Sequence, residues 1–577
     1  MAAGSQFPTR GALRRPRFSP IDVIVFVAIA VLLVGVVRLA QGMNSHSAAA
    51  HVATISTAPS KLPYYAARSL LRMFIALFLS IAFTFVYATA AARSRRARTV
   101  LIPVLDILQS VPILGFLSIT ITFFIGLFPG SILGLECASI FAIFTSQAWN
   151  MTFSMYHSLI TQPAELDEAA RMYRLTKWQR FWKLDVPSSM IGLVWNGMMS
   201  FGGGWFFLAA SEAISVGNNK YTLPGIGSYV ATAVKKGDLN EVGIAIVVMT
   251  VMVIGVNVLF WRPLVAYAEK FRVETSEAAE QPKSYVLNFL RQSHLPEYLA
   301  KPLTPVGRAL DRASRPFGLA EYPLHTPEVK RRAGDAAFSV GTVVVVAWGV
   351  WRGAVYFNHT AGFGQFTHCL GLGFLTFLRV VILVVFSTVI WVPIGVKIGM
   401  NPKLSRYAQP VVQVLASFPA ILLFPFAIVI FLHLGLSLNI GGIFLMALGA
   451  QWYILFNVIA GASAIPTDLR EVMEQFRVPW QQKWRQLILP GIFPYYVTGG
   501  ITAAGGAWNA SIVAEIANYG KHNLVASGLG AYIAQATNNG DKAEVLIGVI
   551  VMSFYVVVVN RLVWRRLYHL AETKYSL

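Results

Sequence analysis

The chain has 577 residues, of which 56% are hydrophobic and only 13% are charged. Soluble domains carry roughly 25% charged residues, so this composition excludes a single soluble core and favours a lipid bilayer as the solvent. The net charge of +21 would suit a nucleic-acid partner, but no basic-aromatic motif is present. Instead, the basic residues stand between apolar runs, as they do in the cytoplasmic loops of membrane proteins.

Apolar stretches long enough to cross a bilayer as helices, about 20 residues each, recur along the whole chain. They predict an all-α polytopic membrane protein with about twelve transmembrane helices. The first six lie near 21–41, 67–92, 102–128, 131–156, 190–213 and 242–261. The other six lie near 335–351, 372–400, 409–434, 437–462, 492–515 and 543–563.

Lysine and arginine indicate the orientation. Basic clusters occupy the N-terminal tail and follow the second, fourth and sixth spans, whereas residues 42–66 carry only Lys61. If the spans alternate, the positive-inside rule places the clusters and both termini in the cytoplasm of a bacterial inner membrane. The small residues 48–50 also fit a signal peptide. However, the first apolar run exceeds the roughly 7–15 residues of such a segment, which favours an uncleaved anchor.

Four regions follow from this pattern. Residues 1–20 form a cytoplasmic tail, 21–270 a first membrane domain, 271–330 a cytoplasmic linker and 331–577 a second membrane domain. The linker is polar and rich in proline, with a short helix expected near 284–292. Its simplest role is that of a tether.

The second membrane domain repeats the first at a spacing of 303 residues. Without a gap, Trp149, Glu168, Pro187, Trp205 and Glu212 match Trp452, Glu471, Pro490, Trp508 and Glu515. Upstream the spacing becomes 307, where Pro103 and Pro112 match Pro410 and Pro419. An even number of spans in each half gives both halves one orientation, so we expect a parallel repeat with a pathway between the halves.

The loop after the fourth span of each half carries a motif. It begins with Glu168-Ala169-Ala170, continues through Arg174 and ends at Pro187, and its copy runs from Glu471 through Arg477 to Pro490. This resembles the EAA loop of the permeases of ATP-driven (ABC-type) importers, which docks on the ATPase subunit. The resemblance assigns coupling to the ATPase to Glu168, Ala169, Ala170, Arg174, Glu471 and Arg477.

Two departures from the motif stand out. The second copy lacks both alanines, and arginine replaces the family's turn glycine at Arg174 and Arg477. A left-handed arginine costs roughly 1 kcal/mol, so we expect either a changed turn or an additional contact to the ATPase. A loop without a partner is the alternative, but its duplication after each fourth span favours coupling.

The region after each loop is similar to the nitrate/sulfonate/taurine/bicarbonate branch of these permeases, with two copies fused in one chain. Small residues and a tryptophan precede a glutamate, and a Gly-x-Gly segment follows it. The candidates for the pathway or gate are Gly202, Gly203, Trp205, Glu212, Gly505, Gly506, Trp508 and Glu515. The alternative is helix packing for the glycines and tryptophans, and an interfacial position near the outer face for the carboxylates.

The predicted function is therefore that of an importer permease that moves a small solute, such as an anion, by alternating access. No Gly-x-x-x-x-Gly-Lys-Ser/Thr motif occurs, so ATP and magnesium are expected on a separate ATPase rather than on this chain. The implied partners are two ATPase copies, a periplasmic or lipid-anchored binding protein and membrane lipid, but no nucleic acid. The sequence indicates neither a metal site nor enzyme activity. An ion-coupled secondary transporter, which also often has twelve spans, and a membrane scaffold are the alternatives.

Overall fold

The computed structural model describes residues 20–43, 55–216, 219–271, 284–293, 362–520 and 522–574, with scattered positions in 305–314 and 336–355. Two compact units divide the chain. One comprises 1–38, 163–187 and 258–322, and the other comprises 39–162, 188–257 and 323–577. Each is described below by itself. The second unit holds most of the membrane helices of both halves.

The first half is almost entirely helical. Its elements are α1 (Pro20–Met43), α2 (Leu62–Arg93), α3 (Arg95–Ser110), α4 (Ile113–Leu127), α5 (Leu133–Ile160), α6 (Ala164–Met172), α7 (Lys177–Arg180), α8 (Val186–Glu212), β1 (Ala213–Val216), β2 (Asn219–Thr222), α9 (Ile226–Lys236), α10 (Leu239–Val256) and α11 (Arg262–Ala268).

The linker and the second half continue this pattern. The elements are α12 (Tyr285–Gln292), α15 (Gly362–Gly399), α16 (Pro402–Ser417), α17 (Phe424–Leu434), α18 (Leu438–Ala464), α19 (Thr467–Gln475), α20 (Trp480–Lys483), α21 (Leu489–Ala514), β3 (Ile516–Tyr519), β4 (His522–Val525), α22 (Leu529–Asn539), α23 (Lys542–Val559) and α24 (Arg565–Lys574). The predicted linker helix is confirmed as α12. The rest of the linker lies mainly outside the described residues.

The described residues contain seven helices that are long and apolar enough to cross a membrane, or nine if each of two bent pairs counts as one span. The all-α membrane fold is confirmed, whereas the number twelve stays a prediction. α5 and α8 occupy two further predicted spans, 131–156 and 190–213. The predicted span 335–351 is described only in part, and there the structure has a short apolar helix, Val340–Gly353.

Two predicted spans are not continuous helices. α3 and α4 meet at an angle of 101°, and α16 meets the helical segment 420–434, which includes α17, at 81°. The breaks fall at Pro112 and Pro419. A proline disfavours helical geometry in the residue before it, and Val111 and Phe418 are accordingly extended, with ψ of 125° and 131°. The predicted spans at 102–128 and 409–434 therefore each consist of two helices with a sharp bend, and a single crossing of the membrane by each pair stays a prediction.

The repeat continues into backbone details. Each half has a short antiparallel hairpin, in which Ala213 pairs with Thr222 and Ile516 with Val525. The sequence patterns did not predict these hairpins. π-helical turns occur at 181–185 and 257–261 and recur, 303 residues later, at 484–488 and 560–564. The first of each pair ends just before Pro187 or Pro490, whose missing N–H cannot take part in regular helical bonding.

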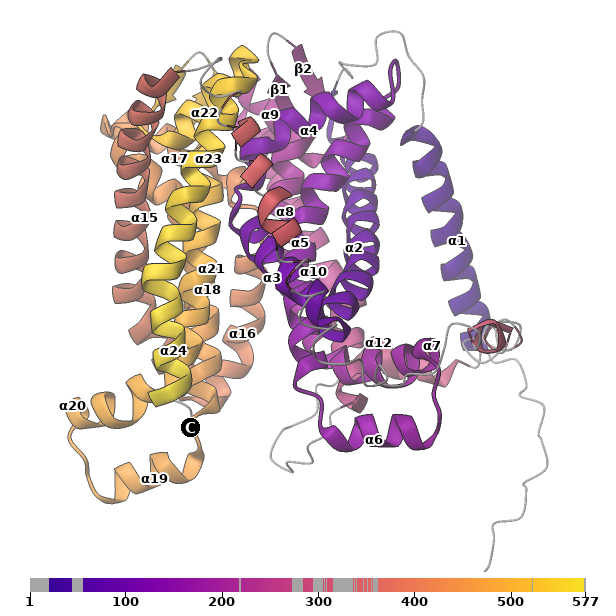
Figure 1. Ribbon diagram of the computed structural model, residues 1–577. Helices are drawn as coiled ribbons and strands as arrows, with labels where there is room; N and C mark the ends of the chain where they lie inside the picture. The colour runs from indigo at the N-terminus through magenta and orange to yellow at the C-terminus, as the bar shows by residue number, and fades with distance from the viewer. Residues whose placement is uncertain are drawn as a thin grey trace, which may run out of the picture. The chain divides into compact units, whose positions relative to one another are not determined.

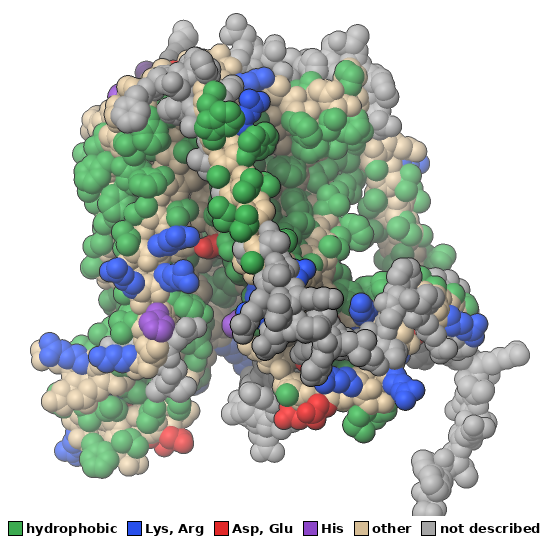
Figure 2. All heavy atoms as spheres, in the orientation of Figure 1, with side chains coloured by type: hydrophobic (Ala, Val, Ile, Leu, Met, Phe, Trp, Pro, Cys, Tyr) green, Lys and Arg blue, Asp and Glu red, His purple; other side chains and the backbone are tan. Residues whose placement is uncertain are grey.

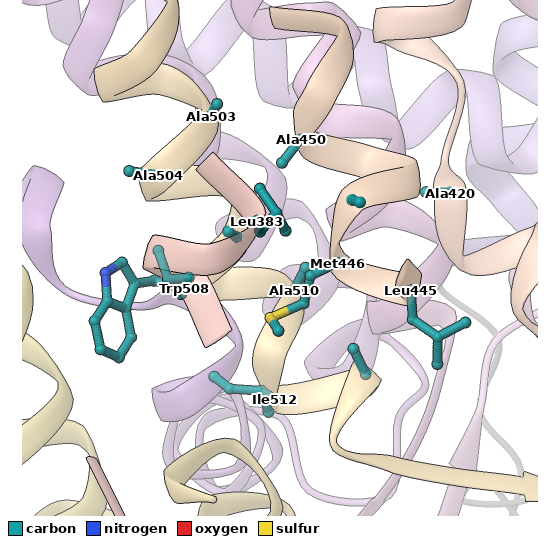
Figure 3. Packing of buried hydrophobic residues seen from close by; sticks show 14 of the residues in the cluster. Leu383, Ala420, Leu445, Met446, Ala450, Ala503, Ala504, Trp508, Ala510 and Ile512 are labelled. Carbon is teal, nitrogen blue, oxygen red and sulfur yellow. The ribbon is translucent and has the colours of Figure 1, made fainter. Parts of the chain in front are cut away.

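The core of the second half lies between α15, α18 and α21, whose facing residues are small or aliphatic. Leu383, Met446, Ala450 and Ala503 are completely or almost completely buried there (Figure 3). Their small and branched side chains let the helices pack closely, as membrane helices do. α15 and α23 expose Phe374, Val385, Val389, Ile550 and Phe554. Figure 2 shows hydrophobic side chains over much of this visible face, as a lipid-facing surface requires.

Within the second unit, α19 and α20 project beyond one end of the long helix α21, while α17 and α22 lie toward the other end (Figure 1). The second loop and the hairpin of the same half are therefore at opposite ends of α21. We call the end of the second unit with α19 and α20 the coupling end, and the end with β3 and β4 the hairpin end.

Candidate functional site

Glu212, the last residue of α8, is 1% exposed. Its Oε1 accepts from Arg72 Nη1 at 2.7 Å and from Ser69 Oγ at 2.5 Å, and its Oε2 accepts from the backbone N–H of Gly227 at 2.7 Å. This burial does not fit the alternative of a simple carboxylate exposed at the membrane interface, whereas a role in the outer gate stays a prediction. Burial is possible because a cation and two further donors neutralise and solvate this carboxylate inside the protein.

Glu515 occupies the same position in the second half and is 0% exposed. It accepts from Arg379 Nη1 at 2.7 Å and from Thr376 Oγ1 at 2.8 Å, and its other oxygen accepts from the N–H groups of Gly530 and Ala531 at 2.8 and 3.2 Å. We name each arrangement of glutamate, arginine, hydroxyl and backbone N–H a carboxylate clamp. Each clamp ties the end of α8 or α21 to α2 or α15 and to the segment after the hairpin.

The Gly-x-Gly segments fit against the clamps. A Cβ on Gly225 or Gly528 would collide with the carboxylate of Glu212 or Glu515. A Cβ on Gly227 or Gly530 would collide with the backbone of α8 or α21. These glycines are therefore required by close approach rather than by left-handed geometry.

The two clamps differ in the number of charged side chains that surround them. In the first half, Glu136 also accepts from Arg68 Nη2 and Arg72 Nε, both at 2.5 Å, so two arginines face two glutamates. At the equivalent positions, 307 and 303 residues later, the second half has Leu375 and Asn439. There Arg379 Nη2 donates to Asn439 Oδ1 at 2.9 Å. One ion pair has been exchanged for a neutral pair, and each clamp still has no net charge.

The predicted pathway glycines lie on α8 and α21, and those of α8 face the second half. A Cβ on Gly202 would lie 2.5 Å from Ser417 Oγ of α16, and one on Gly203 would lie 3.4 Å from the Tyr453 hydroxyl. The equivalent glycines of the second half have more space around them. A Cβ on Gly505 would meet nothing within 4 Å, and one on Gly506 would lie 3.8 Å from Tyr453.

Both predicted gate tryptophans are buried side chains of the helix packing. Trp205 is 1% exposed and packs edge-on against Phe201, with ring centroids 5.5 Å apart. Trp508 is 2% exposed and stacks on Tyr555 of α23 at 6.1 Å. These contacts support the packing interpretation. A role in a gate stays a prediction.

Other contacts join the halves toward the hairpin end. The backbone N–H of Ile113 donates to Asn509 Oδ1 at 2.8 Å, and the Tyr519 hydroxyl donates to the carbonyl of Gly237 at 3.0 Å. A cavity of about 350 Å³ lies between the halves in this region. α4, α8 and α9 line it from the first half, and α17, β3 and α22 are among its walls in the second.

The first coupling loop consists of α6 and α7 and the residues that join them. Glu168 is exposed, Ala169 is partly exposed and Ala170 is buried. Arg174 has a φ of 46°. Arg180 pairs with Asp167 and Asp185, which fixes the two short helices relative to each other.

The second coupling loop, α19 and α20, has the same backbone, with φ of 47° at Arg477. Its Glu471 is exposed, and Arg470 donates to the carbonyls of Ala462 and Met400 at 2.6 and 3.3 Å. Burial lowers the pKa of Arg470 below its usual range. The left-handed turn is thus retained in both copies, so the expectation of a changed turn was wrong. An additional contact through the arginines stays a prediction.

The two coupling loops differ in the contacts that they make with the rest of the chain. Thr176 caps α7 and its hydroxyl lies 3.0 Å from Ser314 Oγ, which belongs to the linker. The equivalent residue of the second loop is Pro479, which is exposed. The linker therefore contacts the first coupling loop, a feature that a plain tether does not require.

Sequence reasoning missed Arg72 and Arg379. A signal for them existed, because Ser69 and Arg72 precede Thr376 and Arg379 by the same 307 residues as the matched prolines. No group of three His, Cys, Asp or Glu side chains placed to hold a metal ion occurs among the residues that the structure describes.

Two segments of the chain, residues 80–262 and 391–572, match the family described as binding-protein-dependent transport system inner membrane component. Together they make up more than half of the chain. Each segment contains one coupling loop and the glutamate of one clamp, so the match coincides with the internal repeat.

Curated relatives are similar to part of the chain. A nitrate import permease protein from Leptolyngbya laminosa is 26% identical over 185 residues, or 32% of this chain and 63% of the relative. A bicarbonate transport system permease protein from Synechococcus elongatus is 28% identical over 31% of this chain and 60% of its own length. A putative aliphatic sulfonates transport permease protein from Bacillus subtilis is 28% identical over 28% of this chain and 54% of its own length. In each case the chain covers less than two thirds of the relative.

Proposed function

Because the chain belongs to the family of binding-protein-dependent transport system inner membrane components and is matched twice, we propose that it carries two permease domains of an ATP-driven importer. The observation that carries this proposal is the pair of coupling loops with one backbone geometry. Their helices stand 303 residues apart, and both turns place an arginine in the left-handed region. A multi-pass membrane protein without such a partner has no physical reason to keep this strained turn twice.

Each loop offers an ATPase subunit the same kind of surface. Glu168 and Glu471 are exposed, and an aromatic residue next to the turn, Tyr173 or Phe476, is 79% or 77% exposed. Large exposed aromatic side chains are typical anchors of protein interfaces. Two such loops support two ATPase copies, on which ATP and magnesium would bind.

The hairpin end of the second unit would receive the solute. The hairpins and the cavity lie at the end of the second unit away from its coupling loop, which supports delivery there by a binding protein. We place the coupling loops and both termini in the cytoplasm, as the basic clusters indicate. The relatives' names suggest nitrate, bicarbonate or a sulfonate as the solute. An ion-coupled secondary transporter gives no role to the loops and is not favoured.

The test is ATP hydrolysis by this chain purified with its candidate ATPase and reconstituted in lipid. The double variant Glu168→Lys/Glu471→Lys should lose stimulation of ATP hydrolysis by the permease and its binding protein. Glu544→Lys, which makes the same charge change at the start of α23 and outside both coupling loops, should keep the stimulation by the permease itself. If no ATPase associates and an ion gradient drives uptake by the chain alone, the secondary transporter takes the place of this proposal.

The single variants compare the two contacts. Because Thr176 of the first loop contacts Ser314 of the linker and the equivalent position of the second loop is Pro479, we expect Glu168→Lys and Glu471→Lys to reduce coupling by different factors. Equal losses would contradict unequal contacts without affecting the proposed function.

A further inference from the structure

The last membrane helix of the chain ends in a cluster of arginines. Arg561, Arg565 and Arg566 lie where α23 continues into α24, and all three are exposed. We call them the arginine cluster. Residues 561–574 contain four basic residues and one acidic residue, Glu572. Figure 2 shows Lys and Arg side chains gathered over the lower part of this helix, which is yellow in Figure 1.

The three arginines share one side of the helix. A π-helical turn joins α23 to α24, and a hydrogen bond from the N–H of Arg565 to the carbonyl of Asn560 closes it. In such a turn, residues four and five positions apart lie on the same side. Arg565 and Arg566 stand four and five positions after Arg561, so three positive charges lie close together. Like charges at this spacing repel each other.

The described part of the chain does not neutralise this charge. There, none of the three guanidinium groups forms a hydrogen bond or an ion pair with another residue. Arg72 and Arg379 of the clamps are different, because they are buried and paired with glutamates. The arginine cluster therefore faces the surroundings of the protein with its charge uncompensated.

The position of the cluster along the helix matches the level of lipid headgroups. α23 has 18 residues, from Lys542 to Val559, which span about 27 Å at 1.5 Å per residue. The hydrocarbon core of a bilayer is about 30 Å thick. With the exposed Lys542 at one membrane surface, the arginine cluster lies at the other.

Apolar side chains continue the same side of the helix into the membrane. Ile550 and Phe554 are 47% and 55% exposed. They stand eleven and seven residues before Arg561, a spacing that places all three on one side of a helix. A lipid whose acyl chains lie along Ile550 and Phe554 would have its phosphate beside the arginines.

The first half of the chain lacks the cluster. The positions 303 residues earlier are Val258, Arg262 and Pro263, so only one of the three is basic. The π-helical turn itself recurs there, at 257–261. The turn therefore forms without three arginines, and the fold alone does not explain the cluster.

We propose that the arginine cluster binds the headgroup of an anionic phospholipid, with the acyl chains against Ile550 and Phe554. Guanidinium groups donate hydrogen bonds to phosphate oxygens in a matching planar geometry. A zwitterionic lipid carries its own cation next to the phosphate and is attracted less. In the orientation proposed above, the bound lipid belongs to the cytoplasmic leaflet. The site requires neither the solute nor the ATPase and gives the second half a lipid contact that the first half lacks.

The test is native mass spectrometry of the full chain in detergent, titrated with phosphatidylglycerol or with phosphatidylcholine of the same acyl chains. The first phosphatidylglycerol should bind about tenfold or more tightly than phosphatidylcholine, since each arginine near an anionic lipid contributes about a factor of five. Arg565→Gln should weaken this binding about fivefold. Arg561→Gln/Arg565→Gln/Arg566→Gln should abolish the preference, and the corresponding triple substitution by lysine should keep most of it.

A matched control separates this site from general attraction by the net charge. Arg95→Gln/Lys403→Gln/Arg406→Gln removes the same charge at exposed positions of α3 and α16 and should keep the preference for phosphatidylglycerol. An equal loss in both triple variants, or no preference in the native chain, would overturn the proposal. The single variant Arg565→Gln and the lysine variant keep the test decisive if the glutamine triple variant fails to fold.

A competition experiment identifies the source of the phosphate. Excess inorganic phosphate, which has no acyl chains to place against the helix, should leave phosphatidylglycerol bound. Displacement of the lipid by inorganic phosphate would show that the cluster binds free phosphate and would contradict a lipid site. Because both measurements use the chain alone in detergent, their results do not depend on whether an ATPase associates with it.

Discussion

At the scale of single residues, the carboxylate clamps show how charges are kept inside an apolar protein. Glu212 and Glu515 are buried because Arg72 and Arg379 lie within 2.7 Å of them. A buried pair adds little stability compared with apolar side chains of the same size, but removal of one partner is strongly unfavourable. The clamps are therefore interpreted as devices that fix the geometry of the hairpin end.

The exchanged ion pair gives a prediction for the first clamp. Glu136→Asn alone leaves Arg68 and Arg72 with one carboxylate and should destabilise the protein by about 3–5 kcal/mol, the cost of breaking a buried pair. Arg68→Leu/Glu136→Asn, which copies the arrangement of Leu375 and Asn439, should be less destabilising than Glu136→Asn. Thermal unfolding of the four proteins of this cycle in one detergent measures the coupling energy. Additive effects would show that the exchange is not compensatory.

At the scale of elements, the coupling loops keep a left-handed turn that normally favours glycine. The φ values of 46° and 47° at Arg174 and Arg477 are the only positive values among non-glycine residues that the structure describes. Backbone strain of this kind concentrates at functional sites. We infer that the arginine side chains supply an interaction with the ATPase that outweighs this strain.

The two roles of Arg174 can be separated by a pair of substitutions. Arg174→Gly removes the guanidinium and relaxes the turn, whereas Arg174→Ala removes the guanidinium and keeps the strain of about 1 kcal/mol. Amides of residues 173–176 should exchange with solvent about fivefold more slowly in Arg174→Gly than in Arg174→Ala, the factor for 1 kcal/mol. Both variants should bind the ATPase more weakly than the native chain. Native affinity in Arg174→Gly would exclude a contact through the guanidinium.

At the scale of the whole molecule, the repeat yields two similar halves whose contacts with each other differ at equivalent positions. Gly202 packs against Ser417 of the other half, while its equivalent Gly505 has open space around it. Asn509, which binds the backbone of Ile113, stands where the first half has Phe206. Fusion of both copies in one chain permits such differences, because each half can change on its own.

This inequality predicts opposite outcomes for one substitution at equivalent positions. Gly202→Val should clash with Ser417 and destabilise the protein by about 1–3 kcal/mol, the usual cost of overpacking. Gly505→Val should change the stability by less than about 0.5 kcal/mol. Thermal unfolding of both variants in the same detergent is the measurement. A similar loss in both would indicate that general helix packing, rather than the contact between the halves, requires these glycines.

Local sequence patterns predicted much of the fold. Apolar runs placed most of the membrane helices, and the fixed spacing of 303 residues identified the repeat and both coupling loops. The bends at Pro112 and Pro419 could also have been predicted from the sequence, because a proline constrains the backbone of the residue before it. They were not predicted because the length of an apolar run does not show whether the chain bends within it.

The partners of buried charges could not be predicted in the same way. Arg72 and Glu212 are 140 residues apart, and a transmembrane arginine alone does not indicate which carboxylate it will meet. The sequence by itself determined the membrane environment, the duplication and the family, because these depend on composition and on short motifs. Only the tertiary structure decided the clamps, the left-handed arginines and the cavity between the halves, because each depends on how distant helices pack together.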